Sequence, residues 1–236
     1  MKVSVIIPAY NENSVIYENM LFLDEKCKEY FGDDYEIVVA SDGSTDGTWD
    51  TVKEKLVPLG IVDAGYEKNL GKGGALRSGV AAASGDILVT TDCDIAYGTE
   101  VIREAVAFLE EHTEYNLLIG SRTKSKDGFE GYPLIRKLAS KIYFTMISVI
   151  AGLKVSDSQS GFKVYRRDEG KKLFAPLETC GFAFDLEILM RATRFGYKIY
   201  EMPVKIIRHS ESKINVVKDS VRMLKDVMRI KKIFKK

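Results

Sequence analysis

Residues 3–8, Val-Ser-Val-Ile-Ile-Pro, form a short apolar run that ends at a proline, which is the pattern of a buried β-strand. A helix is predicted over residues 14–30, and a second buried strand over residues 37–40. The same alternation continues, with strands expected at 61–64, 87–90 and 117–120 and helices expected from 48, over 71–85 and over 99–112. Strands that alternate with helices pair in parallel through helical crossovers. We therefore expect an α/β fold with an open, mostly parallel twisted sheet flanked by helices.

Length and composition limit the class of protein. The chain has 236 residues, about the size of one large domain. Its 45% hydrophobic and 29% charged residues are an ordinary globular mixture, which excludes a fibre or a disordered tail. The formal net charge of +1 excludes a chain-wide basic field, so no nucleic-acid partner is expected. Cys27, Cys93 and Cys180 are too far apart for a zinc ribbon or a redox pair and fit a reducing compartment.

Neither a signal peptide nor a membrane-spanning helix is expected. The N-terminus leads straight into the first predicted strand. The longest uncharged stretch, residues 142–153, has twelve residues, whereas a spanning helix needs about twenty. It belongs to an apolar predicted helix over residues 134–153, for which burial in the core and a position in the headgroup region of a membrane are the two alternatives. A cytoplasmic protein is expected.

Charge is uneven along the chain. Residues 213–236 carry nine Lys or Arg against two Asp, a local charge of +7 that leaves −6 for the rest. A helix is predicted there, with one apolar face formed by Ile214, Val217, Val221, Leu224 and Met228. We therefore divide the chain into a main domain, residues 1–212, and a basic amphipathic helix. Anionic lipid attracts each basic residue near a membrane by about 1 kcal/mol. A membrane surface, packing on the core and a dimer contact are the alternatives for this helix.

The ligands of an open parallel sheet bind outside the carboxyl ends of its strands. The sharpest candidate there is Asp92-Cys93-Asp94, directly after the strand predicted at 87–90. Two carboxylates that flank one residue offer the hard oxygen ligands that Mg²⁺ and Mn²⁺ prefer. A solvated turn is the alternative, because Asp is common in turns.

Residues 69–74, Asn-Leu-Gly-Lys-Gly-Gly, form a second candidate site. Glycines let backbone N–H groups approach an anion and Lys72 adds a positive charge, so the pattern predicts a phosphate cradle. The spacing matches neither a P-loop nor the dinucleotide fingerprint G-x-G-x-x-G. A flexible helix start is the alternative for the same residues.

Four motifs occur in order along the first half of the chain. They are Val-Ile-Ile-Pro-Ala-Tyr-Asn-Glu at 5–12, Ser-Asp-Gly-Ser-Thr-Asp-Gly-Thr at 41–48, Asn-Leu-Gly-Lys-Gly-Gly-Ala-Leu at 69–76, and Asp92 with Asp94. Together they resemble the family 2 glycosyltransferases of the GT-A fold, which use nucleotide-diphosphate sugars. The resemblance spans residues 3–213 and implies that residues 1–212 form a catalytic domain.

Motifs in the second half resemble the polyprenyl-phosphate branch of that family, which contains dolichyl-phosphate mannose synthases and dolichyl-phosphate glucosyltransferases. They are Gly-Ser-Arg at 120–122, Arg136 with Ser140, Asp-Ser-Gln-Ser-Gly-Phe-Lys at 157–163, Gly-Phe at 181–182, Phe-Asp-Leu-Glu at 184–187, and Arg208 with Glu-Ser-Lys at 211–213. The stretches 157–163 and 184–187 are closer to the glucosyltransferases.

The resemblance implies roles for individual residues. It implies that the donor nucleoside is held by Pro8, Tyr10, Glu12 and Asp42. It implies that the metal and diphosphate are bound by Asp92 and Asp94, with Lys72 and Cys93 beside the donor and Asp94 among the catalytic residues. The acceptor phosphate is expected at Arg122, Arg136 and Ser140, and the phosphates near a closing loop at Arg208 and Lys213. The family usually has two adjacent acidic residues where this chain has Ser41-Asp42, so the nucleotide identity stays open.

The acceptor decides whether a general base is needed. A phosphate monoester has a second pKa of about 6, so its oxygen is already an anionic nucleophile at neutral pH. An alcohol acceptor needs a base, for which Asp157 is the candidate. We expect inverting displacement that moves glucose or mannose from UDP-glucose or GDP-mannose to a polyprenyl or dolichyl phosphate. Mg²⁺ or Mn²⁺ would stabilise the leaving diphosphate, and Arg122 would take part in catalysis.

Two other functions stay open. One is transfer to a saccharide or another hydroxyl acceptor, which would not require the group Arg122, Arg136 and Ser140. The other is a sugar-nucleotide-binding or membrane-scaffolding protein without catalysis. The lipid acceptor implies peripheral attachment to the cytoplasmic face of a membrane, by the chain itself or through a membrane-anchored partner. A homo-oligomer is also open.

Overall fold

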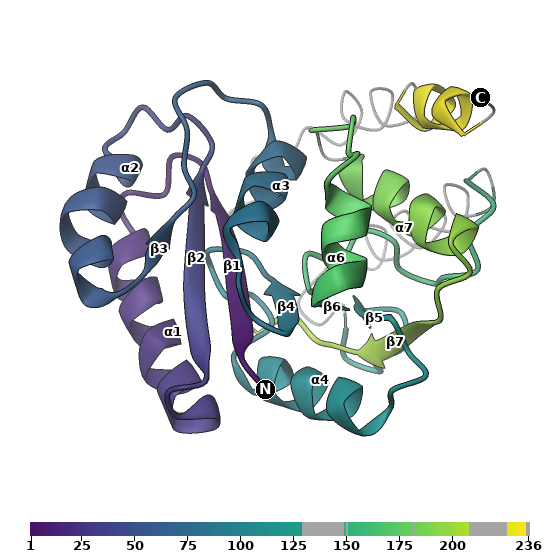
Figure 1. Cartoon of the computed structure of the whole chain (residues 1–236), viewed down its shortest axis with the longest axis horizontal. Helices are drawn as coiled ribbons and strands as arrows, with labels where there is room; N and C mark the ends of the chain where they lie inside the picture. The colour runs from purple at the N-terminus through teal and green to yellow at the C-terminus, as the bar shows by residue number, and fades with distance from the viewer. Residues whose placement is uncertain (129–148, 150, 182, 208–225, 235–236) are drawn as a thin grey trace.

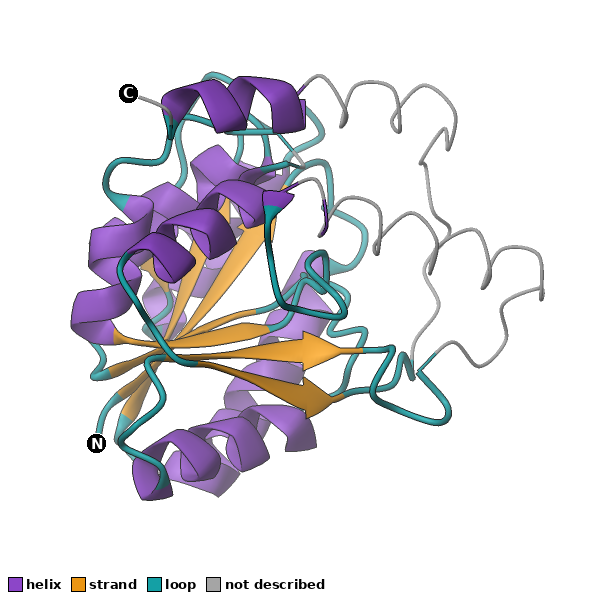
Figure 2. Cartoon of the chain, turned by 90° about the vertical axis from the view of Figure 1, so that its right-hand side faces the viewer, coloured by secondary structure: helices purple, strands orange, loops and turns teal. Residues whose placement is uncertain are grey.

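The computed structural model describes residues 1–128, 149, 151–181, 183–207 and 226–234. Seven strands form one sheet in the order β3-β2-β1-β4-β6-β5-β7, and helices cover both of its faces (Figures 1 and 2). The strands are β1 (Val3–Ala9), β2 (Tyr35–Ser41), β3 (Val62–Asp63), β4 (Ile87–Thr90), β5 (Leu117–Ser121), β6 (Lys163–Arg166) and β7 (Ile199–Pro203). The helices are α1 (Ile16–Phe31), α2 (Thr48–Thr51), α3 (Lys72–Ala82), α4 (Glu100–Glu111), α6 (Arg167–Phe174) and α7 (Phe184–Arg194). The open, mostly parallel α/β sheet expected from the sequence is confirmed.

One strand runs against the others. β6 lies between β4 and β5 and is antiparallel to both, with Lys163 opposite Thr90 of β4 and Ile119 of β5. The amino end of an antiparallel strand meets the carboxyl end of its neighbour. The loop before β6 therefore reaches the edge of the sheet where β4 ends, which is the edge at which ligands of this architecture bind.

The first strand continues through a proline at which we expected it to end. Pro8 pairs with Ala40 of β2, and β1 extends to Ala9. On its other side, β1 pairs with β4 only from Val3 to Ile6. At Pro8 the strand therefore has a neighbour on one side only, and a residue without an N–H is tolerated at such an edge.

The sheet separates two hydrophobic cores. Val5 and Ile7 belong to the core that contains the buried side chains of α1 and α4, whereas Ile6 belongs to the core that contains those of α3, α6 and α7. This division follows from the alternation of side chains along a strand. Helix α3 approaches the sheet closely at Gly79, where an added Cβ would lie 2.5 Å from Cγ2 of Ile6.

One predicted helix differs from expectation, and a second lies mostly outside the described residues. The helix predicted from residue 48 is a single α-helical turn, α2, followed by a π-helical segment (Val52–Leu56) and a 3-10 turn (Val57–Leu59) that ends at Gly60. Of the apolar helix predicted at 134–153, residues 134–148 and 150 lie outside the described part of the chain, which leaves out residues 129–148 and 150.

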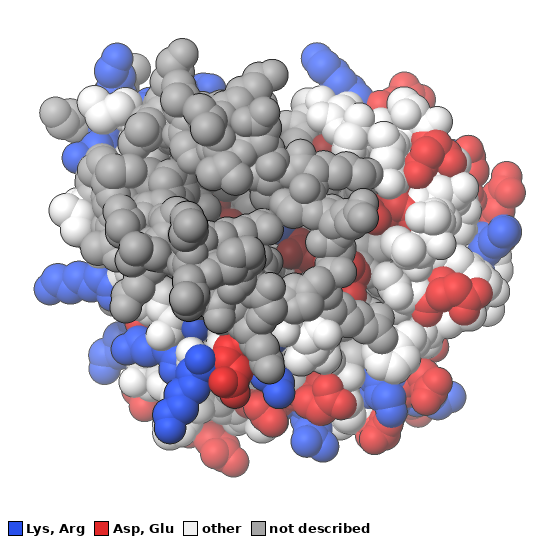
Figure 3. All heavy atoms as spheres, turned by 180° about the vertical axis from the view of Figure 1, so that it is seen from behind, with Lys and Arg blue, Asp and Glu red and all other residues white. Residues whose placement is uncertain are grey.

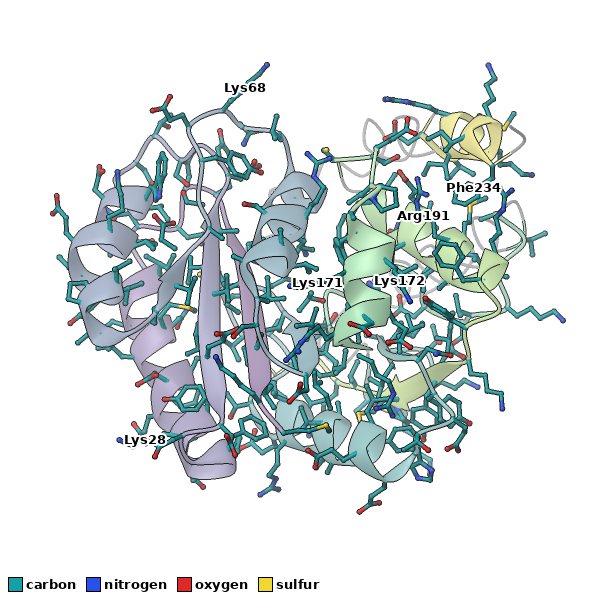
Figure 4. All side chains as sticks on the ribbon, in the orientation of Figure 1. Lys28, Lys68, Lys171, Lys172, Arg191 and Phe234 are labelled. Carbon is teal, nitrogen blue, oxygen red and sulfur yellow. The ribbon has the colours of Figure 1, made fainter. Side chains whose placement is uncertain are left out.

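The C-terminal helix is described over its last turns, residues 226–234, and it packs on α7. Val227 and Ile230 are fully buried in the same core as α7, and Arg191 of α7 lies 5.3 Å from the ring centre of Phe234 (Figure 4). Met228, which we expected on the apolar face, is 58% exposed, so this prediction is wrong for the described turns. Successive residues of a helix are about 100° apart around its axis. A helix that buries Val227 and Ile230 therefore places Met228 on a different side. Residues 208–225 lie outside the described part.

Candidate active site at the carboxyl edge of the sheet

The Asp92-Cys93-Asp94 loop leaves the carboxyl end of β4 in a fixed conformation. Asp94 Oδ1 accepts a hydrogen bond from the N–H of Ala96 at 3.1 Å, and Ile95 has a left-handed backbone with φ of 50°. The side chain of Asp92 is 35% exposed, whereas Cys93 is buried. Burial raises the pKa of the Cys93 thiol well above its ordinary value, so the side chain stays a neutral thiol. The loop thus contains two partly exposed carboxylates one residue apart, Asp92 and Asp94.

Lys72, the first residue of α3, contacts the carboxylate of Asp92 through its ammonium group. Burial lowers the pKa of Lys72, but the negative charges of Asp92 and Asp185 outweigh it and raise that pKa. Burial likewise raises the pKa of Asp92, but Lys72 outweighs it, so the pKa of Asp92 is lowered. Both partners are therefore charged at neutral pH. The predicted metal ligand and the predicted phosphate-binding lysine meet in one ion pair.

The loop before β6 packs directly against Asp92. A Cβ on Gly161 would lie 2.2 Å from Oδ2 of Asp92, so no other residue fits there without displacement. Behind this contact Lys163 is fully buried, and its ammonium lies 2.5 Å from Oδ1 of Asp185 at the start of α7. The motif at 157–163 therefore contacts Asp92 through Gly161 and Asp185 through Lys163.

Arg122 and Asp157 form a two-pronged ion pair. Arg122 Nε donates to Asp157 Oδ2 at 2.7 Å and Nη2 donates to Oδ1 at 2.9 Å, while the backbone N–H of Arg122 donates to Oδ2 at 3.1 Å. Asp157 is completely buried. Burial raises the pKa of Asp157, but the hydrogen bonds and charge of Arg122 outweigh it and lower that pKa. Asp157 is thus an ionised carboxylate that holds the guanidinium in place.

The predicted nucleoside-binding residues come from the carboxyl end of β1, which contains Pro8, and from the loops after β1 and β2, which are linked by hydrogen bonds. Asn11 bridges them, because its N–H donates to Ser44 Oγ at 3.1 Å and its side chain accepts from the N–H of Thr45 at 2.9 Å. Tyr10 is 48% exposed at this junction, and the N–H of Glu12 donates to Thr48 Oγ1 at 2.8 Å.

Asp42 is buried, and its carboxylate holds the loop before α3. It accepts hydrogen bonds from Tyr66 Oη at 2.6 Å and from the N–H groups of Leu70 and Gly71 at 2.8 Å each. Gly71 has φ of 101°, which favours glycine, and it leads straight into Lys72. The carboxylate predicted to bind the nucleoside therefore also positions the lysine that contacts Asp92.

Comparison with known proteins agrees with this arrangement. The family model described as glycosyl transferase family 2 matches residues 4–174, which is well over half of the chain. The chain belongs to glycosyltransferase family 2. The predicted family is confirmed, and with it the expectation of an enzyme that transfers sugar residues.

Three related proteins match this family 2 glycosyltransferase over 97% of its length. The dolichyl-phosphate beta-glucosyltransferases of Dictyostelium discoideum and Saccharomyces cerevisiae are 29% and 30% identical to it, and the chain covers 73% of each. The glycosyltransferase AglD of Haloferax volcanii is 31% identical, and the chain covers 37% of that protein. The resemblance to the dolichyl-phosphate branch is confirmed.

The fold of this glycosyltransferase matches that of glucosyl-3-phosphoglycerate synthase from Mycobacterium tuberculosis. The structure of that enzyme with phosphoglyceric acid superposes with a TM-score of 0.71 at 21% identity, over 97% of this chain and 79% of the other. Its structure with Mn²⁺ and UDP-glucose gives a TM-score of 0.71 at 20% identity, over 96% of this chain and 77% of the other. These similarities confirm the expected GT-A fold.

Some predicted residues of the glycosyltransferase lie outside the described part of the chain. They are the acceptor-phosphate candidates Arg136 and Ser140 and the closing-loop candidates Arg208 and Lys213. Most described candidates follow β1, β2, β4 or β5, and Lys72 begins α3. Pro8 lies near the carboxyl end of β1, and Asp157 lies in the loop before β6. Figure 2 shows the strands of the sheet from the side.

Sequence reasoning missed the Lys163–Asp185 pair as part of the site. Both residues lie in family motifs, but the motifs predicted no site role for either. The available signal was a lysine between Phe162 and Val164 in a strand-like run, because a charge at a buried position requires a partner.

In the part of the chain that the structure describes, no helix is long and apolar enough to cross a membrane. The same described residues contain no cluster of three or more His, Cys, Asp or Glu that could hold a metal ion. Acidic and basic side chains are both spread over the described surface on the face shown in Figure 3.

Proposed function

We propose that this glycosyltransferase moves glucose from UDP-glucose to a polyprenyl phosphate, with inversion at the anomeric carbon and with a divalent metal. Glucose is preferred to mannose because two of the related proteins are named dolichyl-phosphate beta-glucosyltransferases. UDP-glucose and Mn²⁺ are preferred because a protein of the same fold binds both. GDP-mannose and Mg²⁺ are the alternatives to be tested beside them.

The contact between Gly161 and Asp92 carries the proposal. It brings the loop that contains Asp157, which binds Arg122, against the carboxylate of Asp92. The residues proposed to bind the donor diphosphate are thus adjacent to those proposed to bind the acceptor phosphate. A reaction between two phosphate-bearing substrates needs this adjacency, because transfer depends on holding nucleophile and leaving group in line.

The carboxylates of Asp92 and Asp94 are suitable ligands for a divalent metal. They offer hard oxygen ligands one residue apart, and Mg²⁺ or Mn²⁺ commonly completes its coordination with water and substrate phosphates rather than with a full protein cage. A metal held there neutralises negative charge on the leaving diphosphate. Lys72 adds a second positive charge beside Asp92.

Asp157 favours a phosphate acceptor over a hydroxyl acceptor. A general base must accept a proton. Asp157 is poorly suited to this, because it is buried, binds Arg122 through both oxygens and has a lowered pKa. A phosphate monoester needs no base, since it is already anionic near neutral pH. We assign Asp157 to the positioning of Arg122, and Arg122 to the acceptor phosphate, which a planar guanidinium binds in a fixed geometry.

A lipid acceptor implies work at a membrane surface. The basic residues of the C-terminal segment, 213–236, are proposed to attract anionic lipid on the cytoplasmic face. Its described turns are anchored to the protein by Val227 and Ile230, which leaves the exposed residues of the helix available for that contact.

A transfer assay tests the proposal. Purified protein is incubated with Mn²⁺ or Mg²⁺, a short polyprenyl phosphate, and radiolabelled UDP-glucose or GDP-mannose in parallel, and products are extracted into organic solvent. The expected result is label in the organic phase from UDP-glucose, with a β-linked sugar by NMR, because the donor is α-linked. Release of nucleotide only when sugar alcohols are supplied would favour a hydroxyl acceptor. Nucleotide-sugar binding without turnover on any acceptor would favour a non-catalytic binding protein.

A further inference from the structure

Two ion pairs lie close together at the Asp92–Asp94 loop, one partly buried and one fully buried. Lys72 contacts Asp92, and Lys163 Nζ lies 2.5 Å from Asp185 Oδ1. The charges of each pair also influence the pKa values of the other pair. Burial lowers the pKa of Lys72, but the charges of Asp92 and Asp185 outweigh it and raise that pKa. Burial raises the pKa of Asp185, and the opposing charges of Lys163 and Lys72 do not outweigh it. Lys72 therefore has two acidic neighbours and not one.

The backbone fixes this proximity. A Cβ on Gly73 would lie 2.5 Å from Cβ of Phe184, and the N–H of Gly73 donates to the carbonyl oxygen of Cys180 at 2.8 Å. Lys72 and Asp185 are each one residue away from this contact between the first turns of α3 and α7. The two helix ends are locked together, so Asp185 stays within electrostatic reach of Lys72.

A metal bound at Asp92 would compete with Lys72 for the same carboxylate. The ammonium group of Lys72 occupies Oδ1 of Asp92, which is one of the oxygens that a metal would use. A partly buried ammonium that loses its counter-ion carries a desolvation penalty of several kcal/mol. Metal binding would therefore be weak unless a second carboxylate could receive Lys72.

We propose that Asp185 is a positioning residue that receives the ammonium group of Lys72 when Asp92 binds the divalent metal. The inference rests on the metal-dependent function proposed above. Lys163, whose ammonium also donates to the carbonyl oxygen of Ser160, holds Asp185 in place before and after the exchange. The four charges, two positive and two negative, are conserved throughout, and only the partner of Lys72 changes.

A double-mutant cycle tests the exchange through metal binding instead of activity. Mn²⁺ affinity is measured by electron paramagnetic resonance of free Mn²⁺, at a fixed UDP concentration, for the wild type, D185N, K72M and K72M/D185N. In the wild-type background D185N is expected to weaken Mn²⁺ binding about tenfold, because Lys72 then stays on Asp92. In the K72M background the same change is expected to alter affinity less than about twofold. Equal losses in the two backgrounds would overturn the proposal.

Two further variants separate this inference from simpler effects. K163M/D185N removes the buried pair without leaving an unpaired lysine, so it is expected to fold. Its Mn²⁺ affinity is expected to fall about tenfold, as in D185N. D86N removes a carboxylate that binds Arg167 near the start of β4 and is the control for net charge, with affinity expected unchanged. A wild-type protein that binds no Mn²⁺ beside UDP would overturn the metal-dependent function itself. Intact wild-type binding without coupling between positions 72 and 185 would overturn only the inference.

Discussion

Gly161 and Asp92 are in contact so close that a single methyl group at position 161 would lie 2.2 Å from the Asp92 carboxylate. G161A is therefore expected to displace Asp92 and to lower kcat by at least about 100-fold, since an error of about 1 Å in a reacting group has effects of that size. The measurement is steady-state transfer to polyprenyl phosphate. At Gly181 an added Cβ meets nothing within 4 Å, so G181A is the matched control. Equal activity of G161A and the wild type would contradict a role of this contact in the site.

Asp157 positions Arg122, which predicts a specific kinetic signature. D157N weakens the two-pronged pairing with Arg122, so we expect the KM for polyprenyl phosphate to rise about tenfold or more, with a smaller change in the KM for UDP-glucose. The assay varies each substrate at saturation of the other. A loss of kcat alone, with acceptor affinity unchanged, would instead identify Asp157 as a proton acceptor and favour a hydroxyl substrate.

Asp92 and Asp94 are proposed metal ligands, so chelation is expected to remove activity. EDTA should abolish transfer, and excess Mn²⁺ or Mg²⁺ should restore it. D92N and D94N are each expected to lower kcat/KM by about 1,000-fold, because the charge on the leaving diphosphate is then poorly neutralised. Thermal unfolding of both variants serves as the control for folding. Full activity in EDTA would contradict metal dependence.

Glu36 stabilises the amino edge of the sheet in a pH-dependent way. It accepts hydrogen bonds from Lys2, Ser4 and Ser84. Burial raises the pKa of Glu36, but these bonds outweigh it and lower the pKa from 4.5 to about 2. A depressed pKa contributes stability that is fully present above about pH 4.5 and is lost as the pH falls toward about 2.

E36Q is therefore expected to lower the free energy of unfolding at pH 7 by about 2 kcal/mol and to reduce its decline between pH 5 and pH 2, roughly the window set by the two pKa values. Urea unfolding across this pH range measures both. Asp50, whose ion pair with Lys53 is mostly exposed, supplies the control D50N, with a change below about 0.5 kcal/mol. Parallel pH curves for E36Q and the wild type would contradict the assignment.

The C-terminal helix is expected to be part of the folded core. Ile230 is fully buried, so I230A should lower the free energy of unfolding by about 2–5 kcal/mol, as large-to-small core substitutions do. M228A at an exposed position should change it by less than about 0.5 kcal/mol. Similar small effects of both variants in urea unfolding would mean that the helix is not docked in solution.

Much of the site could be predicted from local patterns. The apolar runs that became β1, β2, β4 and β5 end in polar loops, and parallel strands carry such loops to one edge, so Asp92, Asp42 and Arg122 were expected near one another. The exposed face of the C-terminal helix was mispredicted at Met228, because periodicity identifies an apolar stripe but not which of two stripes the core covers.

Periodicity and turn residues act over a few neighbouring positions. The alternation of strands and helices, the polar loops at the strand ends and the family motifs could therefore be predicted from local sequence alone. Contacts between residues far apart in the chain depend instead on how the whole chain folds. The insertion of β6 between β4 and β5 brought Gly161 against Asp92 and buried Lys163 beside Asp185. Strand order is set by how whole helices and strands cover the two faces of the sheet, and no local stretch of sequence contains that information.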